Sequence, residues 1–295
     1  VLPLLEQKFI MGLFEDPYVD PSVAQTVVGN IEHRELALEA ALKTITLLEN
    51  RNNTLPLNQS NLSTIAVIGP NANRSLLGGY SGWPKYDVSL FEGIKAQVGD
   101  KINVLYAEGC KITTTSGIDA NGNKITSADG WNTDSVGLPT KEQDDELIRN
   151  AVSLAKKADV VILAIGGNEQ TSREAWAYNH MGDRTSLDLF GRQQELFNRI
   201  KALGKPVVVV LNNGRPLSVN KVAQEADALL ECWYLGQESG TAIAKVLFGE
   251  FNPGGKLPIS FPRSVGHIPA YYNYKPFDRR GYFNASVKPL YSFGY

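Results

Sequence analysis

The sequence predicts an α/β fold, a mostly parallel, doubly wound α/β/α sandwich. Two observations predict it. Short, almost continuously apolar runs recur along the chain, as is typical of strands buried on both faces. Segments with apolar residues at helical spacing separate these runs, so that strand and helix alternate as they do around a parallel sheet. The 295 residues are 43% hydrophobic, which is enough for a large core.

The individual elements are predicted as follows, beginning at the amino-terminal end. Residues 34–50 carry apolar side chains at helical spacing and are predicted to form an amphipathic helix. Apolar runs predict strands at residues 64–69, 102–106, 159–165 and 206–211, with a fifth favoured at 228–233. Helical patterns lie between these runs at residues 147–157, 192–203 and 240–248.

Composition divides the chain into three parts. Residues 1–56 are predicted to hold a helix leaving an earlier structure, an inter-domain linker and the amphipathic helix, and residues 57–262 the sandwich. Residues 263–295, rich in Pro and aromatic side chains, predict an extended tail leading to a further segment. Polar residues 111–145 predict a long surface insertion. Because the chain lacks an initiator Met and stops abruptly on Phe293-Gly-Tyr295, we expect sequence to be missing at both ends.

Charge, cysteine content and motif searches exclude several classes of function. The formal net charge is -2 and no Lys/Arg-rich run occurs, so neither nucleic acid nor a membrane surface is an expected partner. No apolar stretch approaches the ~20 residues needed to cross a bilayer. Cys110 and Cys232 lack metal-ligand spacing, as do all His/Cys/Asp/Glu groups, so we expect no metal. Neither the dinucleotide fingerprint nor the P-loop is present, so we expect no cofactor.

Two carboxylates directly follow the apolar run at residues 159–165, and both are candidates for a catalytic acid. Ligands bind outside the carboxyl ends of parallel strands, which is where Glu169 and Glu174 are placed. Glu174 is the leading candidate, because partial desolvation beside Trp176 would favour the neutral, proton-donating form of its carboxyl group. Glu169 could serve instead. The alternative is that both are solvated loop carboxylates, the common situation for glutamate.

Other side chains near these carboxylates have weaker functional signals. Asp183 and Arg184 are expected to form a loop ion pair or to cap residues 185–189, and so to orient the acid loop indirectly. His180 has no accompanying nucleophile motif such as Gly-x-Ser-x-Gly and is expected to be structural. Trp83, in a Gly-flanked loop after the first predicted strand, is a candidate platform for stacking on a sugar, with a core or interface position as the alternative.

Several motifs occur in order along nearly the whole chain. They are FIMGLFEDP at 9–17, LLEN at 47–50, LPL at 55–57, IAVIGP at 65–70, GDR at 182–184, WYLGQE at 233–238, LFG at 247–249, NPGGKLP at 252–258 and LYSFGY at 290–295. With these motifs the sequence closely resembles the carboxy-terminal α/β-sandwich domain of glycoside hydrolase family three, the retaining β-glucosidases, β-xylosidases and related exo-acting enzymes.

The resemblance implies roles for particular residues. In this family the nucleophile is an Asp on an amino-terminal (β/α)8 barrel, and the general acid/base is a Glu of the sandwich domain. Residues 172–174, Ser-Arg-Glu, match the family's Ser-Gly-Glu-like motif, with Arg in place of the Gly often found there. Glu174 therefore inherits the acid/base role, with Glu169 as the runner-up. Trp83 would form an aromatic wall that binds the aglycone or the next sugar.

The implied function is part of a retaining exo-acting β-glycosidase, a β-glucosidase before a β-xylosidase. Its substrates would be terminal non-reducing β-linked sugars of an oligosaccharide or an aryl glycoside. The barrel, as a domain or a separate chain, is the implied partner, a homo-oligomer is left open, and the implied location is periplasmic or extracellular. The alternative is a non-catalytic carbohydrate-binding or scaffold domain of the same fold, which would be favoured if Glu174 pointed into the core or paired with Arg184.

Overall fold

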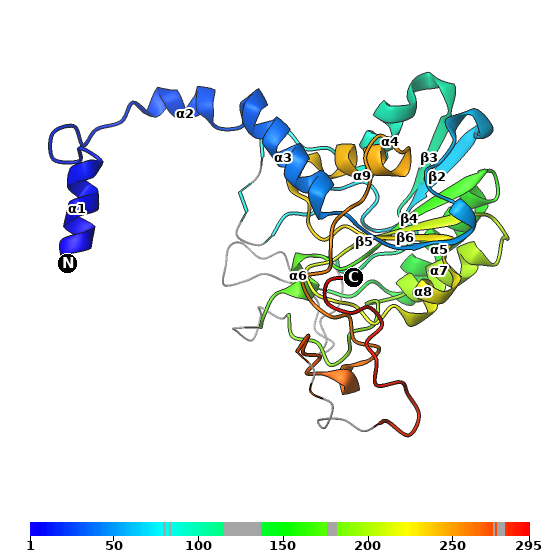
Figure 1. The fold of residues 1–295 in the computed structure, drawn as a ribbon. Coiled ribbons are helices and arrows are strands. Elements are labelled where there is room, and N and C mark those ends of the chain that lie inside the picture. Colours follow the sequence, from blue (N-terminus) through cyan, green and yellow to red (C-terminus); the bar gives the residue numbers. More distant parts are fainter. Residues whose placement is uncertain (79–80, 83, 115–136, 176–181, 274, 276–280) are drawn as a thin grey trace. The chain divides into compact units, whose positions relative to one another are not determined.

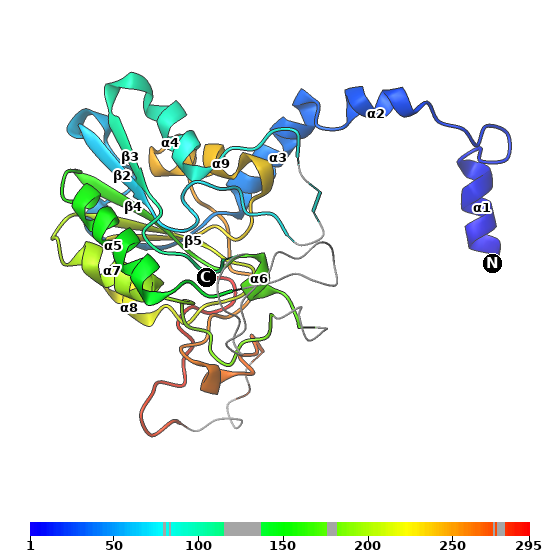
Figure 2. The same ribbon diagram turned by 180° about the vertical axis from the view of Figure 1, so that it is seen from behind.

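A computed structural model gives the fold of the chain (Figures 1 and 2). It describes residues 1–78, 81–82, 84–114, 137–175, 182–273, 275 and 281–295. The chain divides into two compact units, Val1–Leu36 and Ala37–Tyr295. Within the described ranges, no helix has both the length and the apolar character needed to span a membrane.

The first unit contains helices α1 (Leu2–Ile10) and α2 (Pro21–Val27) and the start of α3 (Ile31–Thr44). The carboxylate of Asp20 caps α2 by accepting a hydrogen bond from the backbone N–H of Ser22 at 2.9 Å. Proline at the first turn suits both α1 and α2, because an N–H there would have no partner in the helix. No residue of α1 or α2 is buried, although both helices are largely apolar.

The second unit is built on a six-stranded sheet in the order β1-β6-β5-β4-β2-β3. The strands are β1 Thr46–Asn50, β2 Thr64–Ile68, β3 Asn103–Ala107, β4 Val160–Gly166, β5 Val207–Asn212 and β6 Ala228–Glu231. β1 pairs antiparallel with β6, and the remaining neighbours in the sheet are parallel. The predicted mostly parallel α/β class is therefore confirmed.

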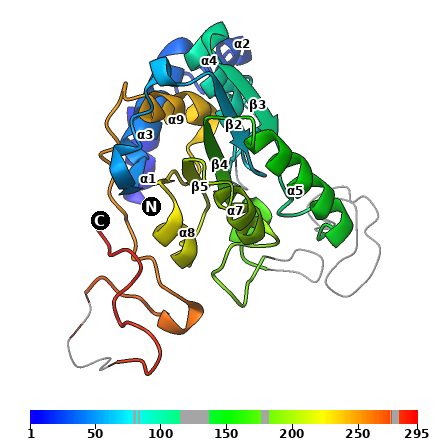
Figure 3. The same ribbon diagram turned by 90° about the vertical axis from the view of Figure 1, so that its right-hand side faces the viewer.

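Helices cover both faces of this sheet (Figure 3). They are α4 Leu90–Val98, α5 Lys141–Ala155, α7 Gln193–Lys201, α8 Asn220–Glu225 and α9 Ser239–Leu247. Alternate side chains of the central strand β4 point to opposite faces: Val161, Leu163 and Ile165 pack with α5, α7 and α8, whereas Ile162 and Ala164 pack with α4 and α9. All five are fully buried, which explains why the strand is continuously apolar in sequence.

The edge strand β1 corrects one prediction from the sequence. The helix predicted over residues 34–50 ends at Thr44 in the structure, and the chain continues as a strand. Leu47 pairs with Leu230 of β6, and the side chain of Ile45 is fully buried. The apolar residues at the end of the predicted helix therefore serve a strand, because pairing with a segment far along the chain outweighs the local helical spacing.

The described C-terminal residues return to this same edge of the sheet. Backbone hydrogen bonds join Phe261 to Tyr291, whose ring is buried. The Tyr291 hydroxyl donates to the Glu49 carboxylate at 2.9 Å, and the Tyr295 hydroxyl donates to the carbonyl of Leu48 at 3.1 Å. Both ends of the second unit are thus tied to β1. Residues 115–136, within the segment predicted as an insertion, lie outside the described ranges, and α5 begins before that segment ends.

Candidate active site

The carboxyl ends of β2 and β4 form the switch point of the sheet. β3 lies on one side of β2 and β4 on the other. The chain leaves β2 toward α4 on one face and leaves β4 toward α7 on the opposite face. Ligands of open α/β sheets bind in the crevice at such a point. The loops that hold Trp83 and Glu174 follow these two strands in the sequence.

The exit from β4 depends on a glycine. Gly166 has φ +139°, and a Cβ there would lie 2.1 Å from the carbonyl oxygen of Asn212 in β5. The side chain of Gln193 is fully buried and forms two hydrogen bonds with the backbone of Gly166. It accepts the N–H of Gly166 at 2.8 Å and donates to its carbonyl at 2.9 Å. On the other side, the Asn71 amide donates to the Gly167 carbonyl at 3.0 Å. The first residues of the acid loop are therefore fixed in place.

A short helix, α6 (Glu169–Ser172), follows directly. Its N-cap is Asn168, whose side chain accepts the N–H of Thr171 at 3.0 Å, while the Thr171 hydroxyl oxygen accepts the N–H of Asn168 at the same distance. This reciprocal capping box satisfies two backbone donors and is buried. It is the local reason why the chain turns into a helix immediately after β4.

The two candidate carboxylates differ in their surroundings. Glu169, in the first turn of α6, forms an ion pair with Arg173 at 3.1 Å between carboxylate and guanidinium. Glu174 lies two residues beyond the end of α6 and is exposed. Within the described part of the chain, no ion pair joins Glu174 to Arg184. The carboxyl group of Glu174 is the more accessible of the two.

Asp183 and Arg184 have separate contacts, and no ion pair between them is found among the described residues. The Asp183 carboxylate accepts the backbone N–H of Ala175 at 3.1 Å. The Arg184 guanidinium donates to the carbonyl of Asp188 and lies over the ring of Phe190, 5.1 Å from its centre. Arg184 therefore contacts the segment at residues 185–189, as expected for a cap, and Asp183 contacts the backbone of the acid loop.

A half-buried tyrosine that follows β6 supports the acid loop. The hydroxyl of Tyr234, just after β6, is 2.7 Å from the hydroxyl of Ser172 at the end of α6. Burial is the main cause that raises the pKa of Tyr234. The Ser172 hydroxyl also donates to the carbonyl of Asn168 at 2.9 Å, so a chain of hydrogen bonds connects β6 to the loop after β4.

A buried carboxylate at the end of β6 was missed by reasoning from the sequence. Glu231, the last residue of β6, is fully buried, and burial raises its pKa to about 8. It accepts the backbone N–H of Trp233 at 2.9 Å and the side-chain amide of Asn213 at 3.3 Å. The signal was a single charged residue inside the apolar run at 228–233. Such a residue is rarely buried without a specific partner.

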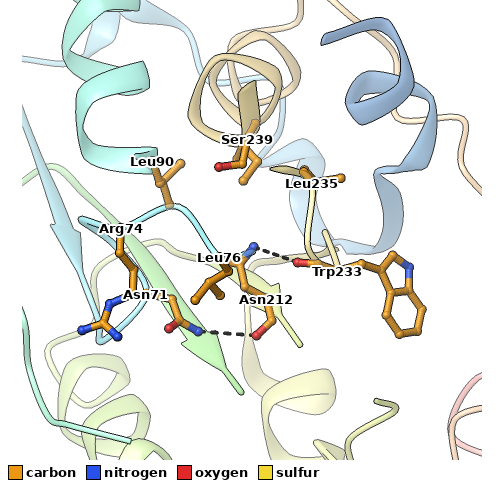
Figure 4. A pocket seen from close by; sticks show the side chains of 9 residues that line it. Asn71, Arg74, Leu76, Leu90, Asn212, Trp233, Leu235 and Ser239 are labelled. Carbon is orange, nitrogen blue, oxygen red and sulfur yellow. Dashed lines mark hydrogen bonds between the residues drawn. The ribbon is translucent and has the colours of Figure 1, made fainter. Parts of the chain in front are cut away.

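A small cavity lies near the carboxyl ends of β2, β5 and β6 (Figure 4). Its lining side chains come from the loop after β2, from α4, from the end of β5, from the loop after β6 and from α9. They are Asn71, Arg74, Leu76, Leu90, Asn212, Trp233, Leu235, Ser239 and Ile243. The cavity volume is about 10 Å³, which suffices for one water molecule and excludes a sugar ring. The amide of Asn71 donates to the carbonyl of Asn212, and the amide of Asn212 donates to that of Trp233, both at 3.4 Å. The cavity therefore lies near the carboxyl ends of β2, β5 and β6, and its lining is part polar and part apolar.

Some predicted site residues cannot be placed. Trp83, Trp176 and His180 lie outside the described residues. The stacking role predicted for Trp83 and the desolvation predicted beside Trp176 therefore stay predictions. In the ranges that the structure describes, no group of three His, Cys, Asp or Glu side chains is arranged to hold a metal ion.

The sandwich matches a known family over most of its length. A family model described as the glycosyl hydrolase family 3 C-terminal domain matches residues 45–295. This chain belongs to glycosyl hydrolase family 3. The matched residues begin beside β1 and include every strand of the sheet, so the family 3 domain corresponds to the second unit from its edge strand onward.

Relatives in family 3 are β-glucosidases and β-xylosidases. A β-xylosidase from Formosa agariphila and a periplasmic β-glucosidase from Salmonella typhimurium are each 41% identical over 99% of this chain. A β-glucosidase structure from Erythrobacter marinus shares 42% identity with a TM-score of 0.86, and one from Listeria innocua in complex with isofagomine shares 30% with a TM-score of 0.77. These cover 96% and 99% of the chain. The chain spans only 37–39% of the length of these four relatives.

Proposed function

We propose that this chain supplies the general acid/base of a retaining, exo-acting β-glycosidase, a hydrolase of polysaccharide degradation. Glu174 is the proposed acid/base, and the Asp nucleophile belongs to a barrel domain or chain that completes the site. The observation that carries the proposal is the position of Glu174. In a family 3 sandwich, it stands exposed on the loop that leaves the central strand β4 at the switch point of the sheet.

The contacts around Glu174 support this choice over the alternatives. An acid that acts on a substrate held by another domain must be accessible, and Glu174 is exposed whereas Glu169 is paired with Arg173. A non-catalytic scaffold would be favoured by a Glu174 that is buried or paired with Arg184. Neither feature occurs among the described residues.

Two features support a missing partner that carries the rest of the site. The small cavity at the carboxyl ends of β2, β5 and β6 is too small for a sugar, so we assign most contacts with the sugar to the barrel. The first unit also exposes many apolar side chains on short helices that bury none of them. Surfaces of this kind mark a contact with another structure. A barrel that carries the nucleophile would supply residues that hold the sugar and would cover the exposed apolar side chains.

The proposed mechanism is double displacement. The Asp of the barrel attacks the anomeric carbon while Glu174 protonates the glycosidic oxygen, and the leaving alcohol departs. Glu174 then removes a proton from the water that hydrolyses the glycosyl-enzyme. Retention of configuration places the two carboxyl groups about 5–5.5 Å apart, which fixes how closely the loop after β4 must approach the barrel.

The proposed substrate class is a terminal, non-reducing β-linked sugar of an oligosaccharide or an aryl glycoside. The Listeria innocua β-glucosidase has been solved with glucose, with isofagomine and, as a mutant, with laminaribiose. We favour β-glucosidase over β-xylosidase activity and assign Trp83 to the aglycone side. A periplasmic or extracellular location follows by analogy with the periplasmic relative.

The test begins with intact mass, to establish whether this chain is joined to or paired with a barrel. The preparation is then assayed with cellobiose and with p-nitrophenyl β-glucoside and β-xyloside. Glu174→Ala should lower kcat/KM for cellobiose on the order of 10²–10⁴-fold, since general acid/base help is worth that much. Aryl glycosides have better leaving groups and should lose less. Azide should restore turnover of the aryl glycoside, because this anion can attack the anomeric carbon of the glycosyl-enzyme without a general base, which releases the Asp and forms a glycosyl azide.

Glu169→Ala is the matched control, because it removes a carboxylate from the same loop. It should leave cellobiose hydrolysis nearly unchanged. If instead Glu169→Ala is the inactive and azide-rescued variant, the assignment moves to Glu169. An active preparation in which neither variant is impaired would contradict an acid/base role for this loop. Sugar binding without any hydrolysis would establish the non-catalytic alternative.

A further inference from the structure

The backbone on both sides of Glu174 is held by side chains from elsewhere in the chain. The carbonyl of Arg173, before it, accepts a hydrogen bond from the Arg215 guanidinium at 3.2 Å. The N–H of Ala175, after it, donates to the Asp183 carboxylate at 3.1 Å. These two groups belong to the two peptide units that flank the Cα of Glu174. Together they fix the backbone from which the Glu174 side chain projects.

Glu174 lies outside helices and strands, so their regular hydrogen bonds do not fix its backbone. α6 ends at Ser172, and Arg173 is already extended with φ -75° and ψ 166°. A loop residue that lacks ladder or helix hydrogen bonds samples several backbone conformations unless side chains hold it. A catalytic carboxyl group needs placement within about 0.5 Å to be effective. The two contacts supply what the missing helix or strand would otherwise provide.

Both holding groups are themselves positioned by the sandwich. The turn at Gly182 is packed directly on the acid loop, because a Cβ at Gly182 would lie 2.3 Å from the carbonyl oxygen of Arg173. This places the neighbouring Asp183 within reach of Ala175. Arg215 follows β5, and its own carbonyl accepts the amide of Asn213 at 2.9 Å.

The Asn213 amide also donates to Glu231, so the support extends to the end of β6. Tyr234, which follows β6, contacts Ser172 at the end of α6. The acid loop is thus braced by the segments that follow β5 and β6. The position of the acid loop therefore depends on how β4, β5 and β6 are ordered in the sheet.

We propose that Asp183 and Arg215 are positioning residues for proton donation by Glu174. This inference rests on the proposed function. Neither residue is assigned a contact with the substrate or a proton to transfer. Asp183 acts as an acceptor for one backbone N–H, and Arg215 as a donor to one backbone carbonyl. The role therefore needs the hydrogen-bonding capacity of residue 183, not its negative charge.

The test compares Asp183→Ala with Asp183→Asn in the complete glycosidase. Asparagine keeps a side-chain oxygen that can accept the N–H of Ala175, whereas alanine does not. For Asp183→Ala we expect kcat/KM for cellobiose to fall on the order of 10–100-fold, the effect of a misplacement near 1 Å. kcat/KM for 2,4-dinitrophenyl β-glucoside should change little, because it reports formation of the glycosyl-enzyme and that leaving group needs no proton to depart. Asp183→Asn should restore most of the cellobiose activity.

Arg215→Met and Arg215→Lys form a second pair, used if Asp183→Ala does not fold. Met keeps the length of the side chain without a donor, and Lys restores a donor, so Lys should recover cellobiose activity. Equal losses on both substrates, no loss on cellobiose, or no recovery with Asn and Lys would each overturn the inference. Glu174→Ala with azide is measured in parallel. If Glu174 proves not to be the acid/base, the proposed function and this inference both fall. If Glu174 is the acid/base, the variants of residues 183 and 215 test the inference independently of the proposed function.

Discussion

The buried carboxyl group of Glu231 predicts a specific dependence of stability on pH. Its pKa in the folded protein is about 8, against an ordinary value of 4.5, and burial is the main cause. The folded protein therefore holds this proton more tightly than the unfolded chain does. The stabilisation that results is fully present below pH 4.5 and is lost as the pH rises through about 8.

The size of the effect follows from the interval between the two pKa values. Each unit of difference corresponds to about 1.4 kcal/mol, so the interval from 4.5 to about 8 amounts to roughly 5 kcal/mol. Glu231→Gln removes the titrating group while keeping an oxygen that can accept the N–H of Trp233. The wild-type free energy of unfolding, relative to that of this variant, should fall by about 1.4 kcal/mol per pH unit between pH 5 and 7.5 and level off above pH 8.

The assay is urea unfolding of both proteins, followed by tryptophan fluorescence, at unit steps from pH 5 to pH 9. The difference between the two free energies cancels every other titrating group that the proteins share. A loss of hydrogen bonding in the glutamine variant would shift the difference by a constant and leave its slope unchanged. Parallel stability curves, or a difference that grows in favour of the wild type as the pH rises, would refute the reasoning.

Three further predictions concern the residues that set the exit from β4 and the core beneath it. Gly166→Ala should lower the free energy of unfolding by more than about 3 kcal/mol, because its Cβ would lie 2.1 Å from the Asn212 carbonyl oxygen; a shift below 1 kcal/mol in urea unfolding would contradict this. Gln193→Leu leaves the buried N–H and carbonyl of Gly166 without their partner and should cost about 2–6 kcal/mol, and Gln193→Glu should cost at least as much in the same measurement, because it buries a carboxylate against the Gly166 carbonyl. Phe197→Ala should cost about 3–5 kcal/mol through the cavity it creates in the core on the α7 side of the sheet, whereas Phe293→Ala, at an exposed position, should cost under 1 kcal/mol; equal losses would show that burial does not decide the effect.

The central strands could be predicted from the sequence because both of their faces are buried. The runs predicted at 159–165 and 206–211 correspond to β4 and β5 with a shift of one residue. The short length of these runs and their many β-branched residues favour a buried strand over a buried helix segment. The predicted strand at 228–233 is too long, because β6 ends at Glu231 and Trp233 adopts a positive φ of 52°.

The edge strand could not be predicted in the same way. β1 is formed by residues whose partner in β6 lies far along the chain, and their apolar spacing also fits a helix. Helix α4, by contrast, was missed despite a local signal. Ser89 and Glu92 form a capping box at its start, a pattern that can be read from the sequence alone.

For the candidate site, the sequence predicted the loop but not what holds it. Glu174 could be placed because it follows a strong strand pattern and because its motif resembles that of a family. The support from Arg215 and Tyr234 could not be predicted, since each depends on the sheet order, which places β5 beside β4 and β6 beyond β5. Such contacts are set by sheet order, which no local pattern contains.

The antiparallel pairing of β1 with β6 also has a consequence for how the protein is made. Thr46 pairs with Glu231, and Asn50 with Ala228. At translation speeds of about 5–20 residues per second, β1 leaves the ribosome roughly 10–35 seconds before its partner strand. During that time Leu47 and Leu48 form an unpaired apolar segment that invites pairing with the wrong strand. The risk of mispairing at β1 is therefore greatest while residues 50–230 are being synthesised.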